Sequence, residues 1–235
     1  SIQEYWLHDG PGEYVDVSAW YHVVIALDST QSTAANRFKV YLNGTQLTNP
    51  TQTSYIDQNS DHVGLASGST VYVGLGKSHN TNVFYADFYM AEVCFIDGTQ
   101  YAASDFGEFD EDSPDIWKPK DPSGLTFGNN GFYLDFEDSS NLGNDANGGT
   151  DLTEVNLAAT DQATDSPTNN FATLNPLDNF YAGGTLSEGN CKYLTASTPY
   201  GFIQSTFNVS SGKWYWEVKN IDGTATMIGA SGASG

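Results

Sequence analysis

Apolar and polar residues alternate with a period of two along residues 20–48, the clearest pattern in the chain. One face of a first strand would carry Tyr21, Val23, Ile25 and Leu27. After a loop of small polar residues, one face of a second strand would carry Phe38, Val40 and Leu42. Asn43-Gly44 then supplies the positive φ angles of a type I′ turn. The pattern predicts a half-buried antiparallel hairpin that turns back at once into Gln46 and Leu47.

The order of this stretch resembles a known family of sandwiches. The run Trp-Tyr-His-Val, an apolar strand, a polar loop, a second apolar strand and Asn-Gly is similar to the laminin-G-like, concanavalin-type jelly roll. Residues 72–97 resemble that family's closing strand pair, which ends in Ile-Asp-Gly. Further short strands are expected at 13–17 and 70–76. The resemblance implies a jelly roll over residues 1–104.

Composition favours the same fold class. The chain has 235 residues, of which 39% are hydrophobic and 14% aromatic, enough to bury a sizeable core. Twenty-four glycines stand beside many Thr, Ser, Asn and Asp residues, which is typical of a β protein with many turns. We therefore expect an all-β protein with almost no helix.

Charge and cysteine content exclude several function classes. Eight basic residues against 29 acidic ones give a net charge of −21, which repels nucleic acid and anionic lipid surfaces. The excess is explained most simply by solubility or by adaptation to salty surroundings. The sequence contains no apolar run of about 18 residues, so we expect no insertion into a membrane. Cys94 and Cys191 are expected to be buried thiols rather than a disulfide framework.

Residues 105–178 are expected to connect two domains. The acidic, proline-containing run 104–119 predicts a linking loop, and a strand pair is expected near 125–136 around an Asn-Asn-Gly turn. The turn-rich remainder has few apolar residues. We expect it to drape over a neighbouring surface through Leu142, Leu152, Val155, Leu157 and Phe171.

Residues 179–235 change character. The string SGKWYWEV at 211–218 is similar to the opening strands of a SPRY domain, itself a β-sandwich. Trp214, Trp216 and Val218 would share one strand face, opposite Tyr215 and Glu217. A whole domain of this kind needs about twice the residues that remain. The resemblance implies an incomplete sandwich whose core tryptophans are covered by sequence beyond residue 235, in a piece of a longer polypeptide.

Across its length the chain resembles structural proteins of tailed phages, many of them marine. The stretches that carry this resemblance are FGNNGFYLDF, SPTNNFATLNPL and SSGKWYWEV. It implies a place on the virion surface, as a tail fibre, spike or head decoration. The expected partners are other virion subunits, including copies of the same chain, and host surface polysaccharide.

A pair of carboxylates offers the one enzymatic hypothesis. Concanavalin-fold glucanases set an acid and a nucleophile on alternate residues of a strand, and Glu108, Asp110 and Asp112 alternate in this way. Residue 111 is charged where an apolar residue is expected, and Ser113-Pro114 favours a loop. We expect no catalytic residue here and no enzyme activity.

An ion site is the second hypothesis, and calcium is the one cofactor considered. Carboxylate and amide oxygens gather between 138 and 151, and the candidate ligands are Asp138, Asn144 and Asp145. Gly149 stands where an EF-hand would have its third ligand, so the spacing also fits a plain turn.

Sugar recognition is the third hypothesis. Jelly-roll lectins use exposed aromatic rings and amide side chains in rim loops. The candidates are Trp6, Tyr55, His79, Asn80 and Asn82, with ordinary edge packing as the alternative. His22 is expected to make a cross-strand hydrogen bond rather than bind metal.

We therefore expect a non-enzymatic phage virion surface protein. A secreted or cell-surface carbohydrate-binding adhesin is the alternative, and a glycan depolymerase is the third class.

Overall fold

The computed structural model describes residues 19–48, 55–60, 88–169, 171–181, 183–195, 201–206, 209–223 and 226–230. The expected strands at 13–17 and 70–76 lie outside these residues. Eleven strands are found in the described part of the chain: β1 (Val23–Leu27), β2 (Phe38–Leu42), β3 (Thr45–Leu47), β4 (Val93–Phe95), β5 (Gly107–Phe109), β6 (Trp117–Pro119), β7 (Phe132–Leu134), β8 (Leu174–Tyr181), β9 (Thr185–Ser187), β10 (Lys192–Leu194) and β11 (Gly201–Ser205). Three 3₁₀ turns join them: η1 (Ala34–Asn36), η3 (Ala103–Asp105) and η4 (Ala159–Asp161).

The first sheet confirms the predicted hairpin. β1 pairs with β2 in an antiparallel register that places Ile25 opposite Val40, and β2 pairs with β3. Asn43 and Gly44 have φ angles of +46° and +76°, as a type I′ turn requires. The chain therefore reverses where the sequence predicted.

Burial within this sheet differs from the prediction. Val40 on the central strand is only 4% exposed, whereas its partner Ile25 on β1 is 64% exposed. Val23 is exposed as well, and Ala26, on the opposite face of β1, is buried. Two residues of the expected apolar face of β1, Val23 and Ile25, are thus open to solvent.

The acidic run 104–119 is not a linking loop, and that prediction was wrong. It contains the β5–β6 hairpin, in which Glu108 lies opposite Lys118 and Phe109 opposite Trp117. Alternation explains the hairpin: the charged side chains share one face, and Gly107, Phe109 and Trp117 share the other. The Asp110 carboxylate accepts hydrogen bonds from the backbone N–H groups of Asp112 and Ser113 and so closes the loop between the strands.

The strand pair expected near 125–136 also differs. β7 pairs with β4 rather than with residues before the Asn-Asn-Gly turn, and the register places Cys94 opposite Tyr133. The turn is held from outside by Asp97, whose carboxylate accepts a 2.7 Å hydrogen bond from the Asn130 side chain. Because β4 precedes residue 104 and β7 follows it, this pairing joins the first two expected regions.

The turn-rich connector covers its neighbours only in part. Leu142 is buried and Leu152 is half-buried. Val155, Leu157 and Phe171 are exposed, so the described residues of this chain do not supply the surface against which they are expected to lie. Residues 138–154 are instead ordered by hydrogen bonds to carboxylates.

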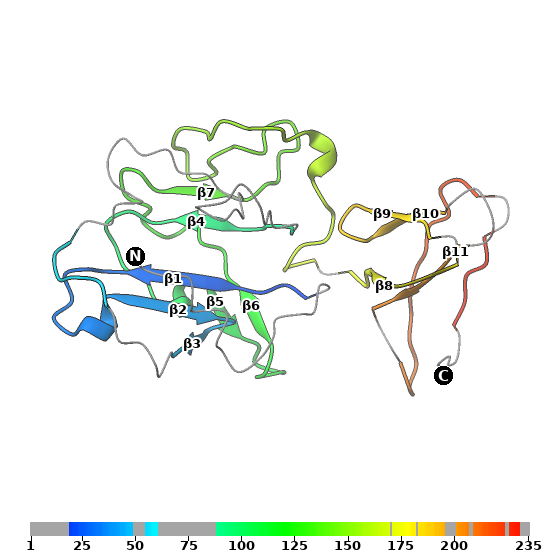
Figure 1. Ribbon diagram of the computed structural model, residues 1–235, viewed down its shortest axis with the longest axis horizontal. Coiled ribbons are helices and arrows are strands. Elements are labelled where there is room, and N and C mark those ends of the chain that lie inside the picture. Colours follow the sequence, from blue (N-terminus) through cyan, green and yellow to red (C-terminus); the bar gives the residue numbers. More distant parts are fainter. Residues whose placement is uncertain are drawn as a thin grey trace.

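The last strands form a separate group, which lies beside β1–β7 in Figure 1. β8 pairs with β11 and β9 with β10, each as an antiparallel two-stranded sheet. The two groups are linked by hydrogen bonds from Trp20 Nε1 to Asp165 Oδ2 and from Gly189 N to the Tyr89 hydroxyl.

The expected strand at 211–218 does not form in the part of the chain that the structure describes. Trp214 is 61% and Trp216 54% exposed, and the Trp214 indole donates to the nearby Ser211 carbonyl. No neighbouring strand among the described residues supplies ladder partners, and isolated strands are not stable in water.

The fold class is all-β, as predicted. The described sheets have two or three strands and none closes into a barrel. The helical elements of the described residues are single 3₁₀ turns. In the described residues, no helix has the length and apolar character needed to cross a bilayer.

Candidate binding cleft

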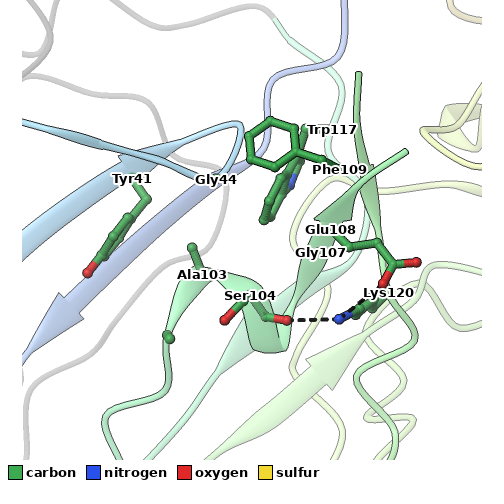
Figure 2. Close-up of a pocket in the computed structure, with 10 residues that line it drawn as sticks. Tyr41, Gly44, Ala103, Ser104, Gly107, Glu108, Phe109, Trp117 and Lys120 are labelled. Atoms are coloured by element: carbon green, nitrogen blue, oxygen red, sulfur yellow. Dashed lines mark hydrogen bonds and ion pairs between the residues drawn. The ribbon is translucent and has the colours of Figure 1, made fainter. Parts of the chain in front are cut away.

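A cleft of about 330 Å³ opens between the first sheet and the β5–β6 hairpin. Figure 2 shows Tyr41 of β2 on one side and Phe109 of β5 with Trp117 of β6 on the other. Ala103 and Ser104 of η3 lie at its base, and Glu108 and Lys120 lie beside the hairpin. Residues 41–44 and the distant stretch 102–120 therefore build one concave surface.

Trp117 is seated between two glycines. A Cβ atom added to Gly44 would lie 2.1 Å from Trp117 Cζ3, and one added to Gly107 would lie 2.5 Å from Trp117 Cε2. Both distances are shorter than any real contact. Because Gly44 also has a positive φ, only glycine serves both the turn and the indole at this position.

An aromatic cluster surrounds the indole. The Phe109 ring meets it edge to face with a centroid distance of 4.9 Å, and the His22 ring lies at 5.8 Å. Trp117 Nε1 and His22 Nδ1 are buried and have no hydrogen-bond partner among the described residues. Burial lowers the pKa of His22, which favours the neutral imidazole.

The expected cross-strand hydrogen bond is not made by Nδ1 of the His22 imidazole, and the bonds found across the hairpin are those of the His22 backbone. Its N–H donates to Asn43 Oδ1 at 2.8 Å, and its carbonyl accepts from the Asn43 N–H at 2.8 Å. These bonds fasten the Asn-Gly turn to the start of β1. The imidazole itself packs on Trp117 instead.

Of the carboxylates in the enzymatic hypothesis, Glu108 and Asp110 lie on the same face of the hairpin and each pairs with a lysine, whereas Asp112 lies in the loop. Glu108 Oε2 is 3.2 Å from Lys120 Nζ, and Asp110 Oδ2 is 3.0 Å from Lys118 Nζ. Lys120 also donates to the Ser104 carbonyl (Figure 2). The hydrogen bond from Lys118 lowers the pKa of Asp110, so that group stays ionised and cannot act as a general acid near neutral pH.

Of the predicted sugar-binding residues, only Tyr55 lies within the described part of the chain. Its ring is exposed, and it is not among the residues that line the cleft. Trp6, His79, Asn80 and Asn82 lie outside the described residues.

The predicted calcium ligands have other partners. Asp145 is 4% exposed, and its carboxylate accepts backbone hydrogen bonds from Tyr133, Asn147 and Gly149. Asp138 accepts from the backbone and hydroxyl of Ser140, and the Asn144 N–H donates to the Asn141 carbonyl. Among the described residues, no group of three or more His, Cys, Asp or Glu side chains is arranged to hold a metal ion.

Both cysteines are free and half-buried. Burial raises the pKa of Cys94 to about 12, so its thiol is protonated and unreactive at neutral pH. Beside it, the Tyr133 hydroxyl donates to the Glu92 carboxylate. Burial raises the pKa of Glu92, and the nearby Asp135, Glu137 and Asp121 act in the same direction.

Sequence reasoning missed the aromatic lining of the cleft. Phe109 and Trp117 were taken as parts of a loop, although each is separated by two positions from a glycine or proline on the same strand face. That spacing was the signal that could have identified the hairpin. Comparison with family models, with curated proteins and with solved structures finds no match to this chain.

Proposed function

We propose that this chain is a non-enzymatic structural protein of a tailed-phage virion surface, a tail fibre, spike or head decoration that assembles with other subunits, including copies of itself. The observation that supports assembly is the run of exposed apolar side chains near the C-terminal end. It consists of Val209, Trp214, Tyr215, Trp216, Val218, Ile221, Met227 and Ile228. These exposed side chains all fall between residues 209 and 228, and large exposed apolar surfaces mark interaction sites.

The small size of the sheets supports the same proposal. Two-stranded sheets are marginal on their own and need further strands or a packed face for stability. The pairs β8–β11 and β9–β10 are of this kind. Within the proposal, residues 1–104 belong to a laminin-G-like jelly roll and residues 179–235 to a SPRY-like sandwich. The apolar run would be covered on assembly.

The charges of the β5–β6 hairpin support a non-enzymatic function. Retaining and inverting glycosidases both require one protonated carboxyl beside one ionised carboxylate. Asp110 is held in the ionised form by Lys118, and Glu108 is paired with Lys120. The pair therefore acts as a cross-strand charge network that strengthens the hairpin.

A carbohydrate-binding adhesin is the second candidate, and the aromatic cleft favours it. Contact with host surface glycans is compatible with both proposed functions, because a virion fibre and a cell-surface adhesin are both exposed to polysaccharide. A depolymerase is the third class.

Two measurements test the proposal. Mass spectrometry of density-banded particles of the encoding phage should find the chain at a fixed copy number, and its absence from particles would overturn the virion assignment. Light scattering on the purified chain should show self-association that Trp214→Ser with Trp216→Ser abolishes. Ile116→Ser is the matched control, because it removes an equally exposed apolar side chain from the β5–β6 loop. Equal loss in the control would contradict the assembly surface.

A further inference from the structure

We infer that the cleft between Tyr41 and Phe109 binds one neutral sugar unit of a polysaccharide. This inference deepens the glycan contact in the proposed function and rests on it. The residues involved are not those that the sequence singled out for sugar binding. They are carried by β2, β5, β6 and the residues that follow β6.

The first argument is shape. A volume of about 330 Å³ lies at the lower end of the range for small-ligand sites. The cleft has an aromatic side chain on each flank, Tyr41 on one and Phe109 on the other (Figure 2). Phe109 is 47% exposed, which leaves part of its ring open to a ligand. An open aromatic ring is the surface against which the C–H groups of a pyranose pack.

The second argument is polarity. Glu108 and Lys120 belong to the edge of the cleft and form an ion pair with no net charge on the outer face of the hairpin; the Lys120 ammonium reaches the cleft lining through its hydrogen bond to the Ser104 carbonyl. Lys120 is 41% and Glu108 51% exposed at the side chain, so both retain donors and acceptors for hydroxyl groups. A purely apolar ligand would desolvate this pair without replacing its hydrogen bonds, which is unfavourable.

The third argument is charge, which decides between sugar classes. The whole chain carries −21 charges, and the one ammonium group in the cleft is neutralised by Glu108. An anionic sugar or a phosphate would therefore meet repulsion, and the described residues that line the cleft offer no unpaired cation against it. A neutral hexose or N-acetylhexosamine meets no such repulsion.

The aromatic side of the cleft is also closely packed. The Trp117 indole is fixed by Gly44 and Gly107, and it supports Phe109 edge to face. The aromatic surface is thus formed before a ligand arrives, which reduces the entropy lost on binding.

Saturation-transfer NMR and calorimetry on the whole chain test this inference. The probes are glucose, galactose, mannose and N-acetylglucosamine at about 10 mM, a range that detects the weak affinity of a single sugar unit, with glucuronic acid as the anionic comparison. We expect binding of at least one neutral probe, weaker binding of glucuronic acid, and a roughly tenfold loss of affinity in Phe109→Leu, a loss equivalent to ~1.4 kcal/mol. Lys120→Met should also weaken binding.

Tyr55→Ala is the matched control, since it removes an exposed aromatic ring outside the cleft. Unchanged binding in Phe109→Leu, loss of binding in Tyr55→Ala, or no binding of any neutral probe would each overturn the inference. Circular dichroism establishes that Phe109→Leu is folded, and Trp117→Phe supplies a second variant at the cleft. Light scattering measures self-association separately. A negative result for sugar binding therefore does not count against the proposed assembly.

Discussion

The indole N–H of Trp20 donates a 2.9 Å hydrogen bond to the Asp165 carboxylate, across 145 positions of the chain. The second oxygen of the same carboxylate accepts from the Phe171 N–H at 2.6 Å. Asp165 therefore fastens the entry to β1 and the entry to β8 to each other. This half-buried side chain and the Tyr89 hydroxyl, which accepts from the Gly189 N–H, link the two groups of strands.

Removing that carboxylate should destabilise the chain. We expect Asp165→Ala to lower the free energy of unfolding by about 1–3 kcal/mol, because a half-buried indole N–H and a backbone N–H both lose a charged acceptor. Urea denaturation measures the change. Trp20→Phe removes the donor alone, and the double variant should show coupling of about 1 kcal/mol. Strict additivity of the two single changes would mean that the bond contributes nothing.

Substitutions at Gly44 and Gly98 allow the cost of backbone strain to be measured apart from the cost of a steric clash. Gly44 and Gly98 have φ angles of +76° and +85°, but only Gly44 has a neighbour where a Cβ would stand. Gly98→Ala should cost about 1–2 kcal/mol for the left-handed backbone alone. Gly44→Ala should cost a further 1–3 kcal/mol, as is typical of overpacking, because Trp117 must move. Thermal denaturation compares the two variants. Equal midpoints would show that Trp117 moves away from the added methyl group without a cost in stability.

Local signals explain what the sequence predicted well. The Asn43-Gly44 turn was predictable because the two residues that require positive φ are adjacent and their flanking strands alternate. The β5–β6 hairpin was missed because the acidic residues of its outer face dominated the interpretation of the run. The lysines that pair with this face, Lys118 and Lys120, follow Asp110 by eight residues and Glu108 by twelve residues, respectively.

Non-local contacts explain what the sequence could not show. Phe132 and Tyr133 are near an Asn-Asn-Gly turn that favours a local hairpin, yet their strand pairs with β4, almost forty residues earlier. Asp97 decides this by holding the turn from the side of β4. The cleft likewise depends on Gly44, Gly107 and Trp117 meeting in space, which no spacing along the chain encodes.

Asp145 should be a structural residue of its loop. Asp145→Ala leaves three backbone N–H groups without an acceptor, one of them buried, and we expect a loss of about 2–4 kcal/mol in unfolding free energy. Asp138→Ala, which removes an exposed carboxylate from the same loop, should cost less than about 1 kcal/mol.

The same loop tests the calcium hypothesis. Because the oxygens of Asp145 already accept backbone hydrogen bonds, we expect about 1 mM Ca²⁺, enough to fill typical extracellular sites, to leave the melting temperature unchanged relative to EDTA. A rise in melting temperature with Ca²⁺ that is lost in Asp145→Ala would establish the ion site instead.

Glu92 should make stability fall as pH rises. Its folded pKa is raised above its ordinary value near 4.5, chiefly by burial, so folding favours the protonated form. This contribution is fully present below the ordinary pKa and is lost as pH rises through the folded pKa. Glu92→Gln keeps an oxygen that accepts from Tyr133 and removes the charge, so melting curves between about pH 4 and pH 8 should lose this part of the slope. An unchanged slope would place the titration elsewhere.

Hydrolysis of polysaccharide is the measurement that separates a binding protein from a depolymerase. Each glycosidic bond that is cleaved liberates one reducing end. We expect none to appear on incubation with host surface polysaccharide, because Asp110 is kept ionised by Lys118 and Glu108 is paired with Lys120. Retention of the polysaccharide without release would agree with a sugar-binding cleft. Release that disappears in both Glu108→Gln and Asp110→Asn would require an acid and a base in this pair and would overturn the non-enzymatic function. Release that survives both changes would come from a contaminant or from residues outside the hairpin. Repeating the assay after further purification of the two variants distinguishes these sources, because only a contaminant would be removed.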